Sequence, residues 1–438
     1  MAVSGESVTP LLIRPHPDDR GQLLTDGDGD TQLDASLRGL ENFLRIFGFC
    51  QYSPLSFVLS WLSFLALAVL LPFLIIEFSY CANCEKYEIR SFELEILVCQ
   101  ALAAAISLLC VSHNLRKYGV RKFLFVDRTH GHLAQFRDQY LKMIRGFFRL
   151  LLMWVVPCFI IKTAREVLRI IYTHDKSWWP SVLMLFALLF SWAYSTIIFL
   201  SGSALFNLVC NFQVIHFENF GKLLEEDRSV SAYIEEHIRL THHLSKISHR
   251  FRIYLLFEFL VVTASQFVAL LQTTGNRGII NFLNGCDFVI SSVVQLVGIV
   301  VCLHAAAKIS HRAQSLGSVA SRWHAIVTSS LEDASLPITA NANGNTAVAT
   351  PSNSLPISYS ESDLEAVDYV PVPTNSQLAS YMTSYHKRQA FVTYLQTNPG
   401  GASIFGWTVD RVLINTLFFM EMALVLFVLG KTITITTK

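Results

Sequence analysis

Charged side chains are scarce in this chain. Asp, Glu, Lys and Arg make up 15% of its 438 residues, against about 25% in typical soluble domains. Positive and negative charges nearly cancel, leaving a formal net charge of +1, whereas a nucleic-acid-binding surface needs a basic excess. The shortage of charge argues against a soluble globular protein, and the balance argues against a nucleic-acid partner.

Motifs of covalent catalysis and nucleotide binding are also missing. The sequence has no G-x-x-x-x-G-K-[ST], no G-x-S-x-G and no glycine-rich dinucleotide fingerprint. The histidines between residues 237 and 249 lack the H-E-x-x-H spacing of a helical zinc site, so we interpret them as surface histidines. They are His237, His242, His243 and His249. We therefore expect no enzymatic activity, no metal and no cofactor.

Long apolar runs are what the chain has instead. Hydrophobic residues make up 52% of it, and a helix needs about 20 mostly apolar residues to cross a bilayer. The run at 146–161, the third along the chain, is the shortest, and we predict that it continues as a helix over 162–172. The first follows a largely polar stretch rather than a short basic start, so we read it as a span and not as a secretory signal. We predict seven spans, at 55–76, 94–111, 146–161, 182–209, 253–271, 288–307 and 412–429.

Lysine and arginine predict the orientation, because cytoplasmic loops are enriched in them. They crowd the segments after the second, fourth and sixth runs, whereas the other loops carry few. The exception is the loop after the third run, which carries Lys162, Arg165, Arg169 and Lys176, and we interpret the first two as snorkelling to an interface. We expect an all-α, seven-transmembrane-helix bundle in the plasma membrane, with the N-terminus inside and the C-terminus outside.

Segments outside the runs complete the expected organisation. Residues 216–252 combine apolar periodicity with charge and should extend the fourth and fifth helices into the cytoplasm. Asn398-Pro399-Gly400-Gly401 is a strong helix stop, so the last element should be split. The expected parts are a disordered acidic cytoplasmic tail (1–36), six spans with cytoplasmic extensions (37–330), a disordered cytoplasmic insertion (331–374) and a split seventh helix (375–438), whose cytoplasmic part is 377–397 and whose spanning part is 408–430.

Polar and aromatic residues inside the runs are the candidates for a binding site, because polar groups are costly in lipid. They could line a mostly aromatic cavity for a small organic ligand, although hydrogen bonding between helices is the plainer reading. The candidate pocket residues are Gln100, Trp154, Trp192, Tyr194, Gln266 and Gln295.

The last run has one periodic face that could line a pore if four copies met around an axis. Ordinary packing on neighbouring helices is the alternative. Its members are Asn415, Phe418, Met422, Val425 and Leu429. Separately, Cys81, Cys84 and Cys286 fall in predicted outer loops, where a disulfide is an open alternative to free thiols.

The C-terminal region resembles a known family. The matching segments are 386–389 (His-Lys-Arg-Gln), 398–401, 405–407 (Phe-Gly-Trp), Arg411 and 429–432 (Leu-Gly-Lys-Thr). They are similar to the plant gustatory-receptor-like family, membrane proteins of unknown function that are also described as extracellular ligand-gated ion channels and as distant relatives of insect gustatory and odorant receptors. The resemblance covers most of the chain from about residue 37 onward.

The resemblance implies a seven-helix bundle with a split last helix and a ligand-gated, non-selective cation channel. It also implies a homotetramer with the last helix lining the pore, and a small-molecule ligand. The residues themselves leave open a small-molecule carrier and a non-conducting membrane scaffold or receptor. A carrier usually shows internal repeats and paired broken helices near the midplane, and neither is visible here.

Overall fold

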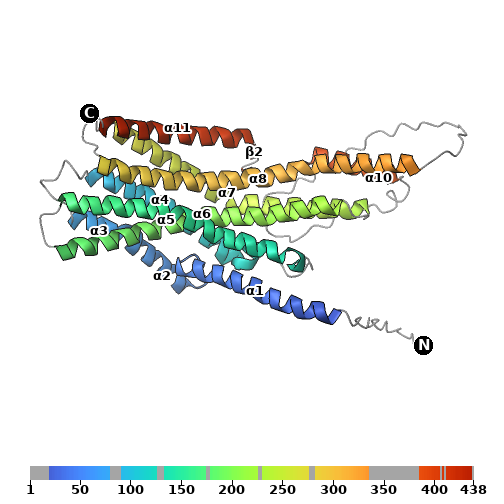
Figure 1. Cartoon of the computed structure of the whole chain (residues 1–438), viewed down its shortest axis with the longest axis horizontal. Coiled ribbons are helices and arrows are strands. Elements are labelled where there is room, and N and C mark those ends of the chain that lie inside the picture. Colours follow the sequence, from blue (N-terminus) through green and yellow to red (C-terminus); the bar gives the residue numbers. More distant parts are fainter. Residues whose placement is uncertain are drawn as a thin grey trace, which may run out of the picture.

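Long helices lying side by side form the molecule (Figure 1). The computed structural model describes residues 19–78, 90–125, 133–173, 178–224, 229–275, 282–334, 384–404, 407–408 and 411–436. The helices are α1 (Asp19–Ile46), α2 (Pro54–Phe64), the π-helix η1 (Leu65–Leu70), α3 (Leu71–Phe78), α4 (Arg90–Phe123), α5 (Leu133–Thr173), α6 (Trp178–Leu223), α7 (Val230–Gly275), α8 (Phe282–Ala334), α10 (Ser384–Thr397) and α11 (Arg411–Thr436). Strands β1 (Ser403–Ile404) and β2 (Trp407–Thr408) form one short antiparallel ladder.

Six stretches of helix within the described residues are long and apolar enough to cross a membrane: Pro54–Glu77, Glu93–Phe123, Phe136–Ile171, Ser181–Leu223, Val230–Val268 and Cys286–Thr328. They contain the first four and the sixth predicted runs and most of the fifth, so the chain is a multi-pass membrane protein. The third run is continuous with the helix predicted after it, as α5 shows. The predicted seventh span corresponds to α11, which is not among the six, and it stays a prediction.

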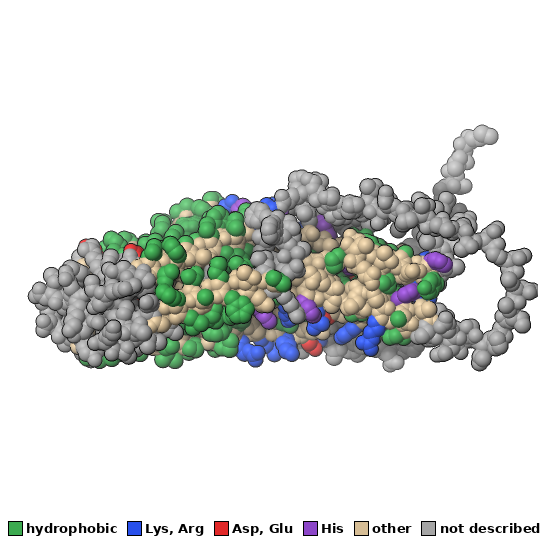
Figure 2. Space-filling view, turned by 90° about the horizontal axis from the view of Figure 1, so that it is seen from above, with side chains coloured by type: hydrophobic (Ala, Val, Ile, Leu, Met, Phe, Trp, Pro, Cys, Tyr) green, Lys and Arg blue, Asp and Glu red, His purple; other side chains and the backbone are tan. Residues whose placement is uncertain are grey.

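The longest helices extend well beyond the thickness of a bilayer. At 1.5 Å per residue, the 46 residues of α7 extend for about 69 Å, roughly twice the hydrocarbon thickness. Figure 2 shows the consequence on one face: hydrophobic side chains gather over one half of the bundle, and Lys, Arg and His side chains over the other. The helical extension predicted for residues 216–252 is confirmed by the ends of α6 and α7.

Two expectations are corrected by the packing of these extensions. Residues 19–36, assigned above to a disordered tail, belong to helix α1, in which Leu33, Leu37, Leu40 and Leu44 are buried. Their spacing of three or four residues places them on one helical face, and α1 packs against α5. The segment expected to present surface histidines buries His237 and His242, because α7 continues into the packed bundle.

The predicted break before the last helix is confirmed. α10 ends at Thr397, and the side-chain amide nitrogen of Asn398 donates to the Tyr394 carbonyl (3.0 Å). Gly400 then takes a φ of +64°, a conformation that favours glycine. The Ala402 backbone N–H then donates to Ser310 Oγ on α8 (3.1 Å). From there the chain turns back, and α11 lies along α7 and α8 (Figure 1).

Candidate functional site

A face of α5 carries charges of both signs inside the bundle. Lys162, Arg165, Glu166 and Arg169 follow each other at the i, i+3, i+4 and i+7 spacing that places them on one side of a helix. All four are at least nine-tenths buried. The snorkelling interpretation of Lys162 and Arg165 is therefore wrong, because both side chains turn into the protein rather than towards an interface.

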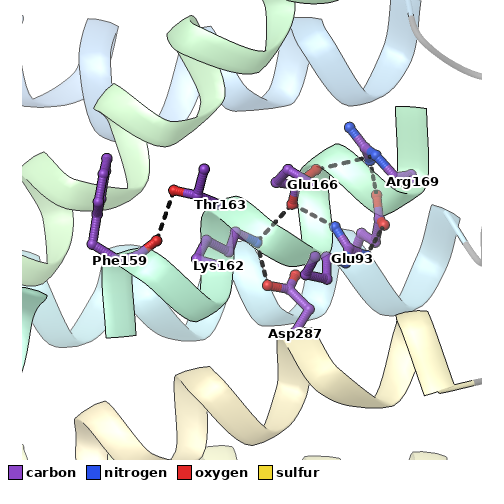
Figure 3. A network of polar contacts seen from close by, with 8 residues as sticks. Glu93, Phe159, Lys162, Thr163, Glu166, Arg169 and Asp287 are labelled. Carbon is purple, nitrogen blue, oxygen red and sulfur yellow. Dashed lines mark hydrogen bonds and ion pairs between the residues drawn. The ribbon is translucent and has the colours of Figure 1, made fainter. Parts of the chain in front are cut away.

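Carboxylates from two other helices meet this face (Figure 3). Arg165 donates to Glu93 of α4 at 2.7 Å, and Arg169 reaches the other oxygen of Glu93 at 3.3 Å. Lys162 pairs with Asp287 near the start of α8. The six residues thus tie α4, α5 and α8 together.

Within α5, Glu166 holds the centre of this ion network. Its carboxylate lies 3.0 Å from Lys162 Nζ, 2.5 Å from an Arg165 nitrogen and 3.1 Å from Arg169 Nε. Removing ions from water is expensive, and only close geometry with several hydrogen bonds per ion offsets that cost. The network meets this condition, with three cations facing three carboxylates and every one of them paired.

A pocket opens beside the ion network. It contains about 460 Å³ of space free of protein atoms when its open mouth and the solvent there are included. One side is charged, formed by the network itself. The rest of the wall comes from α3, α4 and α6 and includes apolar Pro72, Ile96 and Leu188 and polar Gln100, Ser191 and Trp192.

A π-helix shapes the wall next to α6. In η1 the Leu71 N–H bonds the Ala66 carbonyl, five residues back, and Pro72 has no N–H to give. The Leu67 carbonyl is therefore left without its helical donor, and Ser191 Oγ on α6 donates to it at 2.7 Å. This bond fixes Ser191, one residue before Trp192, against the helix that carries Pro72.

The predicted pocket residues separate into three groups. Gln100 and Trp192 both line the pocket. Gln266 and Gln295 meet each other instead, the Gln266 amide nitrogen donating to Gln295 Oε1 at 3.3 Å between α7 and α8. Trp154 and Tyr194 are not among the residues that line the pocket. Trp154 is 36% exposed on the outer surface of α5, and Tyr194 stacks on Phe47 with ring centroids 6.1 Å apart.

The remaining predicted residues lie on or near the last helices. On α11, Asn415 is exposed, Phe418 and Met422 are half-buried, and the side chains of Val425 and Leu429 lie outside the described part of the structure. Cys286 is a half-buried free thiol. Cys81 and Cys84 lie outside the described residues.

The ion network is what sequence reasoning missed. Its signal was present: both signs of charge recur on one helical face directly after the third apolar run, and Glu93 and Asp287 stand at the starts of the second and sixth runs. Consecutive spans cross the membrane in opposite directions. The starts of the second and sixth runs therefore lie on the same side as the end of the third, where their charges can pair.

Comparison with solved structures identifies the fold. The insect olfactory receptor OR5 from Machilis hrabei, solved in complex with eugenol, aligns over 91% of this chain and 99% of its own, with a TM-score of 0.51 and 12% sequence identity. No curated protein sequence matches the chain. The two share a helical fold.

The family follows from the sequence itself. The profile of the family described as Protein of unknown function (DUF3537) matches residues 35–420, which span all six candidate membrane helices and the break before the last helix. The chain therefore belongs to the DUF3537 family, with the fold of an insect olfactory receptor.

Proposed function

We propose that this chain is a gustatory-receptor-like membrane receptor for a small organic molecule. In this proposal it works as a ligand-gated, non-selective cation channel in the plasma membrane, with its N-terminus inside and its C-terminus outside. Four copies form the channel, and α11 lines the pore. The pocket beside the ion network is the ligand site.

The position of α8 carries the proposal. α8 contributes Asp287 to the pocket wall, and the same helix packs along α11. A ligand that binds one arrangement of the pocket more tightly than another shifts the population towards that arrangement. A shift of α8 relative to α5 would then reach α11 directly.

The surface of α11 supports a role at a subunit axis. It contacts α7 and α8 on one side and leaves large apolar side chains exposed on the other, among them Val412, Phe419, Leu426 and Phe427. In a tetramer, α11 would separate lipid, partner subunit and pore. The proposed pore face is the one predicted from the sequence: Asn415, Phe418, Met422, Val425 and Leu429.

Imaging of the purified protein in nanodiscs tests the assembly. A fourfold ring with α11 at its axis is the expected result, and a monomer or a dimer without a shared axis would remove the pore. Current recordings from the same protein in planar bilayers test the gating. Eugenol is a sensible first probe because it is bound in the insect receptor of the same fold.

A pocket-filling substitution connects the two parts of the proposal. Leu188→Trp places an indole in the pocket wall and should abolish a eugenol-evoked current. Trp154→Phe, on the outer surface of α5, is the matched control and should leave the current unchanged. An evoked current that survives in well-expressed Leu188→Trp would move the ligand site elsewhere.

A further inference from the structure

The charges that line the pocket cancel. Among the residues that the structure describes, three cations and three carboxylates face it, and they are paired with one another at 3.3 Å or less. They are Lys162, Arg165, Arg169, Glu93, Glu166 and Asp287. A ligand with a net charge would leave one charge without a partner in a buried site, which is strongly unfavourable.

One polar group of the pocket wall is unsatisfied. Trp192 is 5% exposed, and its indole Nε1–H is buried without a hydrogen-bond partner among the described residues. An indole nitrogen can only donate, so its missing partner is an acceptor. Gln100, half-buried on the same wall, can both donate and accept.

We propose that the pocket selects uncharged organic molecules that carry a hydrogen-bond acceptor, and that it rejects their carboxylate and ammonium analogues. The apolar wall packs against the body of such a ligand. The ligand's acceptor atom accepts a hydrogen bond from the Trp192 indole N–H, and the ion pairs of the network remain intact. This inference rests on the proposed ligand site and names the chemical class that the site takes.

Three probes of similar size and different charge test the selectivity. Benzyl alcohol is neutral, benzoate is anionic and benzylamine is cationic at neutral pH. Binding to the detergent-solubilised full-length protein is measured by saturation-transfer NMR, with protein-free micelles as the blank. We expect benzyl alcohol to bind at least about tenfold more tightly than either charged probe, since tenfold is a small part of the cost of burying an unpaired ion.

Two substitutions change the pocket charge and should change the preference in opposite directions. Asp287→Asn leaves one extra positive charge and should favour benzoate over benzyl alcohol relative to wild type. Lys162→Gln leaves one extra negative charge and should favour benzylamine. Equal binding of all three probes by wild type, no binding of any, or unchanged preferences in folded variants would each overturn the inference.

Trp192→Phe keeps the test decisive if the charge variants do not fold. It retains an aromatic ring and removes only the Nε1–H donor. Benzyl alcohol should bind about fivefold more weakly, the effect of one neutral hydrogen bond, and toluene, which has no acceptor, should be unaffected. Equal weakening of both probes would show that the indole acts only by packing and would overturn the acceptor requirement.

The inference and the proposed channel fail in different ways. Binding of benzyl alcohol without any evoked current would sink the channel and leave the selectivity standing. A current evoked by benzoate or benzylamine, and abolished by Leu188→Trp, would overturn the selectivity and leave the proposed channel standing.

Discussion

Replacing Arg165 by methionine is the most direct test of the buried ion network. Arg165 is 3% exposed and holds Glu93 at 2.7 Å and Glu166 at 2.5 Å. Methionine fills similar space along the stem but carries no charge, so two carboxylates lose a buried partner. Removal of one member of a buried pair typically costs about 3–5 kcal/mol, and we expect a loss of that size.

The chain offers a matched control on its surface. Arg312 and Glu218 form an ion pair at 3.0 Å, with 48% and 44% of their side chains exposed. Exposed pairs contribute about 0–1 kcal/mol because water screens them, so Arg312→Met should cost no more than that. The difference between the two arginines isolates burial, since the substitution and the length of the ion pair are similar.

Equilibrium unfolding in mixed micelles, titrated with sodium dodecyl sulfate and followed by circular dichroism, measures both free energies. The double variant Arg165→Met/Glu93→Gln adds a second check, because it removes both partners of one contact. Its loss should be smaller than the sum of the single losses by about 0.5–3 kcal/mol. Equal losses for Arg165→Met and Arg312→Met would show that water screens the buried ion network as it screens the surface pair. The argument that the pocket rejects charged ligands would then be refuted as well.

Three other predictions concern packing, polar pairing and the proposed pore. A Cβ on Gly298 would lie 2.6 Å from Phe199 Cζ, so Gly298→Ala should lower the free energy of unfolding by about 1–3 kcal/mol; Gly146→Ala, which meets nothing within 4 Å, should be neutral or stabilising by up to about 1 kcal/mol in the same titration. Gln266 Oε1 and Gln295 Nε2 are buried without partners among the described residues, so Gln295→Leu alone should destabilise by about 1–3 kcal/mol, whereas adding Gln266→Leu should restore much of that loss; a double variant less stable than the single one would contradict this. Leu429→Ser should raise the basal current by wetting the proposed constriction, and an unchanged current at equal surface expression would remove this residue from the pore.

Much of the fold could be predicted from the sequence because the information is local. The length and polarity of an apolar run decide whether a helix can cross a bilayer, and six predicted spans are candidate spans in the structure. The stop at Asn398-Pro399-Gly400-Gly401 acts within four residues and ends α10 as predicted. The amphipathic period of 216–252 likewise belongs to the helices that carry it.

The residues of the candidate site could be predicted only in part, because their placement depends on how the helices pack and not on local sequence. Gln100 and Trp192 could be selected because each is polar or amphipathic within an apolar run, but Trp154 and Tyr194 show the same local pattern and face elsewhere. Which side of a helix meets a cavity depends on its rotation against its neighbours, and a single run does not encode that.

By itself, the sequence determined the class of the protein, six candidate spans and the split before the last helix, because lipid and backbone geometry act on each segment separately. Only the tertiary structure decided that Lys162 meets Asp287, 125 residues further along, and that Arg165 meets Glu93, 72 residues before it. Charges that looked misplaced beside the third run are stable there because three helices bring their counter-ions to the same depth, and in a low dielectric only such pairing offsets the loss of water.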